Sequence, residues 1–181
     1  MLLSASLQEK NRTLAVLGAL CIFLSAIEYM IPKPLPFFRL GLANLPLMLA
    51  LDILPFGSFL VLVCIKIFGQ AVISGTLFSY VFLFSICGTL FSALSMYFLR
   101  KCFGKEKISF IGIGIAGALV SNIMQLFLAY FFIFKESVRY IAPVFLAAGL
   151  ITGIALGVFC ETFSKRSLWY KKVCVKGQKN E

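Results

Sequence analysis

Long runs of apolar residues alternate with short polar, proline-containing or glycine-containing segments along nearly the whole chain. Runs of this length, with few charged residues inside them, are typical of transmembrane helices. The pattern therefore predicts an all-α, polytopic membrane protein built as a bundle of six transmembrane helices. The expected spans are residues 13–31, 40–54, 56–74, 77–99, 108–134 and 140–163, followed by a basic cytoplasmic tail over 164–181.

The second expected span differs from the others because it is short and contains Pro46. About 20 apolar residues are normally needed to cross roughly 30 Å of hydrocarbon. We therefore expect this segment to be tilted, kinked or buried against other helices. Before it, Pro32, Pro34 and Pro36 exclude a helix and predict an extended loop up to Phe38.

Composition supports a single membrane domain over residues 1–181. Hydrophobic residues make up 61% of the chain and charged residues only 13%, against roughly 45–50% and about 25% in soluble domains. The net charge of +10 could indicate a nucleic-acid partner, but the basic residues lie in short loops and in the tail. That distribution is typical of membrane proteins and argues against nucleic acid as a partner.

The basic residues also predict an orientation in the membrane. If both termini are inside, the inner segments hold twelve lysine and arginine residues, whereas the outer loops hold only Lys33, Arg39, Lys135 and Arg139. Because basic residues accumulate in cytoplasmic loops, we expect both termini to lie in the cytoplasm.

The residue types present exclude several kinds of chemistry. The chain has no histidine and a single aspartate, Asp52. Histidine-based catalysis, histidine metal sites and a magnesium–diphosphate site built from paired aspartates are therefore not expected. The six cysteines are scattered without a CxxC pair, which argues against a disulfide framework or a metal site. We predict a protein that is not an enzyme and that uses no cofactor or metal.

Polar residues inside the apolar spans are the strongest functional signal, because a charge within a bilayer is costly and marks a functional site by default. The predicted orientation and a rise of about 1.5 Å per residue place seven of them in the outer half of the membrane. The inner half is almost purely apolar, apart from Asp52 and Glu161 near the inner interface. We expect the seven to line an outward-facing pocket for a small molecule. They are Glu28, Arg39, Asn44, Lys66, Gln70, Asn122 and Gln125.

Several of these residues also have a purely structural interpretation. Glu28 could pair with Arg39 and close the outer side of the bundle. Lys66 could extend toward an interface, although its place near the midplane makes that reach poor. Asn122 and Gln125 could instead connect helices through hydrogen bonds.

The last two expected spans are rich in small residues. Gly149, Gly153 and Gly157 recur every four residues, as do Gly114 and Ala118. Such stripes let helices approach closely in lipid. We expect them to pack helices within one bundle rather than to form a dimer.

Two sequence segments connect the chain to a known family. RLGLANLP (residues 39–46) and IKIFGQ in the third span resemble a family of small bacterial membrane proteins labelled heptaprenyl diphosphate synthase component I, or Gx transporter. That family is similar to the substrate-binding S components of energy-coupling-factor (ECF) transporters. Ala15 and Ala19 form an AxxxA pattern in the first span, like the small-residue patch with which S components dock on a transmembrane coupling protein.

The resemblance implies a function as well as a fold. It implies a subunit of the bacterial plasma membrane that captures a small vitamin-like metabolite from outside, and Lys66 with Arg39 favours an anionic one. A coupling protein and ATPase subunits would drive import, because this chain has no GxxxxGK[ST] motif. The alternative is a non-catalytic membrane accessory subunit of a polyprenyl diphosphate synthase, or another lipid-binding protein. A structural adaptor would leave the polar residues unexplained, and an ion-driven transporter would need paired intramembrane acids.

Overall fold

The structure, a computed structural model, describes residues 2–31 and 40–178 and contains helices but no strand in these ranges. Five helices hold an apolar stretch long enough to cross a membrane. Their bounds are α1 Leu2–Met30, α3 Phe56–Ser74, α4 Tyr80–Lys107, α5 Phe110–Ala129 and α6 Val138–Arg166. The shorter elements are η1 Leu42–Asn44, α2 Leu45–Ala50, the π-helical turn η2 Tyr130–Phe134, η3 Lys135–Ser137 and α7 Leu168–Gln178.

The second expected span is not a transmembrane helix, so the predicted number of six was wrong and the described residues hold five. Residues 40–54 form η1 and the six-residue helix α2, which is about 9 Å long against roughly 30 Å of hydrocarbon. Pro46 lies in the first turn of α2, where its missing N–H breaks no helical bond. Every residue of α2 is buried, so protein rather than lipid surrounds this segment.

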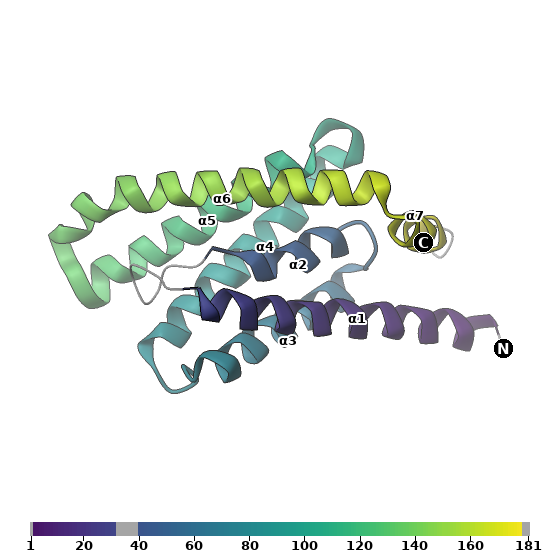
Figure 1. Ribbon diagram of the computed structural model, residues 1–181, viewed down its shortest axis with the longest axis horizontal. Coiled ribbons are helices and arrows are strands. Elements are labelled where there is room, and N and C mark those ends of the chain that lie inside the picture. The colour runs from purple at the N-terminus through teal and green to yellow at the C-terminus, as the bar shows by residue number, and fades with distance from the viewer. Residues whose placement is uncertain (1, 32–39, 179–181) are drawn as a thin grey trace.

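The long helices form two groups with α2 between them. α5 packs against α4 and α6, and α1 packs against α3. α2 contacts members of both groups, and α3 also packs directly against α4 away from α2. Figure 1 shows that α1 begins and α6 ends at the same end of the bundle. We call this the terminal end and the opposite one the loop end. The assignment of the terminal end to the cytoplasm stays a prediction.

Local sequence explains several helix boundaries. The expected third span, 56–74, coincides with α3, which ends at Gly75 with a φ of 64°, a left-handed conformation that glycine adopts without strain. The side chains of Ser79 and Ser109 accept hydrogen bonds from the first turns of α4 and α5. α4 continues past its expected end through the charged segment and is interrupted only at Gly104.

The basic tail contains a helix that the sequence pattern did not predict. α6 ends at Arg166, Ser167 is extended, and α7 begins at Leu168. Figure 1 shows α7 nearly end-on while α6 runs across the view, so the two helices are steeply inclined to each other. α7 therefore lies across the terminal end of the bundle.

Close packing of α5 on α6 depends on small residues. A Cβ atom at Gly114 would lie 2.5 Å from the carbonyl oxygen of Gly153, and one at Gly157 would lie 2.5 Å from the Cα atom of Ile111. No larger residue fits at these distances without moving a backbone. The expected use of this stripe within the bundle is confirmed.

Candidate functional site: a polar cavity between the two helix groups

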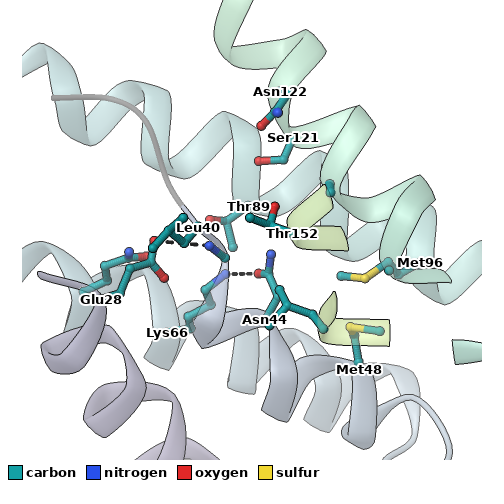
Figure 2. A pocket seen from close by; sticks show the side chains of 15 residues that line it. Glu28, Leu40, Asn44, Met48, Lys66, Thr89, Met96, Ser121, Asn122 and Thr152 are labelled. Carbon is teal, nitrogen blue, oxygen red and sulfur yellow. Dashed lines mark hydrogen bonds between the residues drawn. The ribbon is translucent and has the colours of Figure 1, made fainter. Parts of the chain in front are cut away.

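A cavity lies where α2 separates the two helix groups, and polar side chains from both groups line it (Figure 2). We call it the polar cavity. Five of the seven residues singled out from the sequence line it. They are Glu28 from α1, Asn44 from η1, Lys66 and Gln70 from α3, and Asn122 from α5.

The other two expected residues are placed differently. Gln125 is 2% exposed and lies one turn after Ser121, a residue of the cavity wall, but does not line the cavity itself. Arg39 lies outside the described residues, as does the proline-rich loop predicted to cover the pocket. A role in ligand binding therefore stays a prediction for all seven.

The charged residues of the cavity belong to the α1–α3 group. Lys66 is only 3% exposed and donates a hydrogen bond from Nζ to Oδ1 of Asn44. Glu28 is 1% exposed and accepts, at Oε1, the backbone N–H of Gly41 at 3.3 Å. Figure 2 shows the Lys66 side chain pointing toward Asn44. Lys66 is thus held inside the bundle and does not extend to an interface.

The opposite wall carries neutral polar groups from α4, α5 and α6. Asn122 donates from Nδ2 to the carbonyl oxygen of Phe145 at 2.9 Å, so it connects α5 to α6 as well as lining the cavity. Gln125 donates from Nε2 to Oγ of Ser121 at 2.9 Å, within α5. Of the expected interhelical bonds, the structure shows the one made by Asn122. Thr89 and Thr152 complete this wall.

The cavity is small, and one of the polar atoms beside it lacks a hydrogen-bond partner among the residues that the structure describes. The volume available to the centres of water molecules is about 30 Å³, enough for one or a few ordered waters. Ligand pockets for small molecules are usually about 300–1,000 Å³. Oε1 of Gln70 is buried and has no hydrogen-bond partner in the described part of the chain. Bound water would satisfy this oxygen, whereas a larger ligand requires the two helix groups to separate.

A second polar cluster, at the terminal end, was not predicted as a unit. We call Asp52, Arg100 and Tyr170 the terminal cluster. Arg100 donates from Nε and Nη2 to the two carboxylate oxygens of Asp52 at 2.8 and 2.7 Å. The Tyr170 hydroxyl donates to Oδ2 of the same carboxylate at 3.0 Å. The predicted place of Asp52 near the inner interface was the only signal in the sequence, because Tyr170 lies 118 positions from it.

Burial and a neighbouring charge explain why the Tyr170 phenol stays protonated. It is 5% exposed, and burial followed by the neighbouring Asp52 carboxylate raises the pKa of its phenol above the ordinary value of 10.0. The protonated hydroxyl is the form that can donate to Asp52. The cluster therefore fastens α7 to the end of α2 and to α4 at neutral pH.

Glu161, also placed near the inner interface by the sequence, supports α5. Its Oε2 accepts the backbone N–H of Phe110 at 3.1 Å, and its Oε1 pairs with Lys165 at 3.0 Å. A carboxylate at a helix N-terminus is favoured by the helix dipole. Arg100 also lies over the ring of Phe110, 4.7 Å from its centroid, so α4, α5 and α6 meet at this point.

Ala15 and Ala19, the predicted docking residues, lie on the outer surface of α1. Both side chains are exposed, so the surface that they share is open to lipid or to another membrane helix. Docking stays a prediction. Among the described residues, histidine, cysteine, aspartate and glutamate form no group of three or more that could hold a metal ion.

These features define a multi-pass helical membrane protein with a polar cavity in its interior. A family model described as heptaprenyl diphosphate synthase component I matches residues 17–163, which is most of the chain. The protein belongs to this family. No curated protein and no solved structure matches the chain.

Proposed function

We propose that the protein is the membrane-embedded, non-catalytic subunit of a polyprenyl diphosphate synthase and works with a separate catalytic subunit. The family description, component I of a heptaprenyl diphosphate synthase, supports the existence of a second component. The five apolar helices would keep the pair at the bilayer, where a long isoprenoid product has to be released.

The contacts of Asp52 with Arg100 and Tyr170 are the observation that best supports this proposal. Prenyl transfer from diphosphates depends on magnesium held by carboxylates, and magnesium prefers oxygen ligands of this kind. Asp52 is the only aspartate in the chain, and Arg100 and Tyr170 occupy both of its oxygens. The glutamates do not replace it, since no three acidic side chains of the described residues lie close enough to hold a metal ion. The carboxylates for the chemistry would therefore come from the partner.

An elongation assay tests the proposal. The tagged protein is purified in mild detergent from the cells that produce it, and incorporation of isopentenyl diphosphate into long chains is measured with magnesium present. We expect activity in the fraction that contains a second, aspartate-rich subunit and none in this chain alone. Elongation by the second subunit at the same rate and to the same chain length without this chain would contradict the proposal.

A paired substitution separates structural from catalytic use of Asp52. Asp52→Asn together with Arg100→Gln removes both charges, so neither is left buried without its partner. We expect the doubly substituted protein, once shown to be folded by size-exclusion chromatography, to sustain elongation in the complex at nearly the original rate. Loss of elongation in a folded complex would show that Asp52 takes part in the chemistry.

The polar cavity favours a second candidate, the binding subunit of an ECF-type importer. A buried ammonium, a buried carboxylate and several amides and hydroxyls converge there, and a few placed polar groups in an apolar site can orient a small anionic metabolite. Ala15 and Ala19 would then dock on a coupling protein that works with ATPase subunits. Replacing both alanines with leucine should abolish uptake and leave ligand binding intact. If uptake survives, this candidate is wrong.

A further inference from the structure

A second hollow lies beneath α7 at the terminal end, and it is larger than the polar cavity. Its volume is about 460 Å³, within the usual range of about 300–1,000 Å³ for ligand sites. We call it the terminal cleft. Its lining comes from the end of α2, α4, the start of α5, the end of α6 and α7. The polar side chains in that lining are Asp52, Arg100, Ser109, Glu161, Ser164, Tyr170 and Lys171.

α7 presents two different faces at this position. Tyr170 and Cys174, one turn apart, line the terminal cleft and face the bundle. Leu168 and Trp169 are 73% and 40% exposed, and Lys172 is also exposed. A helix that lies across the end of a membrane bundle with apolar, aromatic and basic residues on its free face is typical of the bilayer interface.

One of the charged side chains that line the terminal cleft has no ion-pair partner among the described residues. Asp52 is paired with Arg100, and Glu161 is paired with Lys165. Lys171 lines the cleft, is exposed, and has no ion-pair partner among the described residues. Arg100 has five N–H donors, of which two bind Asp52 and one binds the carbonyl oxygen of Ile108. The lining holds two carboxylates and two cations, so its charges are equal in number. An anion could pair with Lys171 and use the two remaining N–H donors of Arg100.

We propose that the terminal cleft binds the phosphate group of a lipid headgroup from the adjacent leaflet, with Lys171 as its ion-pair partner. The location favours a lipid over a soluble anion. Phe103 of α4 and Phe159 of α6, both toward the terminal end of their helices, are 52% and 54% exposed, so acyl chains can lie against these helices. Trp169 would lie at headgroup level. This inference is independent of the proposed synthase function.

The test uses the full chain in phosphatidylcholine nanodiscs into which phosphatidic acid is titrated, with lipid retention counted by native mass spectrometry. Lys171→Gln is compared with Lys172→Gln, an adjacent exposed lysine that does not line the cleft. We expect the first substitution to weaken retention of phosphatidic acid about tenfold and the second less than threefold. Trp169 is the only tryptophan, and its unchanged emission spectrum would show that α7 is still in place.

The outcomes separate the possible ligands. Inorganic pyrophosphate that fails to compete supports a lipid ligand, whereas pyrophosphate that competes as strongly as phosphatidic acid keeps the phosphate site but overturns its assignment to a lipid. Equal losses in the two lysine variants would show that general surface charge holds the lipid, and would overturn the proposal. So would retention that does not distinguish phosphatidic acid from phosphatidylcholine.

Discussion

Asn122 reaches the backbone of α6 only because residue 149 is a glycine. Its Nδ2 donates to the carbonyl oxygen of Phe145, and a Cβ atom at Gly149 would lie 1.9 Å from that nitrogen. No side chain can share this space. The bond joins the two helices beside the polar cavity, so the shape of the cavity depends on a residue that does not line it.

Gly149→Ala should therefore destabilise the bundle by about 2–3 kcal/mol, because the buried amide loses its partner and the helices are forced apart. The measurement is the free energy of unfolding in mixed detergent. Gly57→Ala is the matched control, since a Cβ atom there meets nothing within 4 Å and alanine favours helix by up to about 1 kcal/mol. Equal effects of the two substitutions would contradict the packing argument.

The ion pair of Asp52 and Arg100 leads to a second prediction, which concerns the free energy of unfolding. Both side chains are nearly buried, with exposures of 5% and 8%. Removing one partner leaves an uncompensated charge, so Asp52→Asn alone should cost about 3–5 kcal/mol. The double substitution with Arg100→Gln should cost clearly less, and a double-mutant cycle of unfolding free energies measures the difference. Strict additivity of the two single effects would show that the pair is not coupled.

At the scale of elements, α7 depends on a protonated phenol. The folded-state pKa of Tyr170 is raised above 10.0, so the folded protein keeps this proton at pH values where the unfolded chain loses it. The stability that results is fully present below pH 10 or so and decreases as the pH rises above that value.

Alkaline pH should therefore detach α7 from the bundle. We expect the emission of Trp169, next to Tyr170 in α7, to change above about pH 10 before the long helices unfold, as followed by circular dichroism. Tyr170→Phe has no phenol proton to lose, so the same titration in this variant should lack that step. If both proteins show the same alkaline change, the lysines or another group cause it.

The elements differ in how well the sequence predicts them. The span expected over 56–74 is observed at those positions because its apolar run is bounded by Pro55 and Gly75, which start and end a helix locally. The segment over 40–54 has the composition of a span but folds as the short helix α2. Its burial is decided by neighbouring helices and not by its own residues. The sequence pattern did not predict α7, because Tyr170 and Cys174, one turn apart, are separated by basic residues and form no long apolar run.

At the scale of the whole molecule, the half of the membrane in which each polar residue lies could be predicted from the sequence. The hydrogen-bond partner of each residue could not. The order of the spans and the rise per residue were sufficient to expect Glu28, Lys66 and Asn122 in the same half of the membrane, and the structure brings all three to the polar cavity. The rotation of each helix about its axis depends on packing. An interhelical bond of Asn122 was expected, but its partner in α6 and the pairing of Lys66 with Asn44 could therefore not be predicted.

The boundary between the two helix groups matters for function because the polar cavity lies there. Charged groups of the α1–α3 group face neutral polar groups of α4, α5 and α6 across the polar cavity. The space between them accepts water but not a metabolite. A synthase subunit needs no further opening here, whereas an importer subunit must open the same boundary to admit its ligand.

Native mass spectrometry of the gently purified protein tests the central proposal most directly, because it reports bound proteins and bound small molecules together. The proposed function predicts the 20.0 kDa chain in complex with a second, aspartate-rich subunit that elongates isoprenoid chains. A complex with a coupling protein and ATPase subunits, or the chain alone with a soluble metabolite bound, would contradict it and favour the importer.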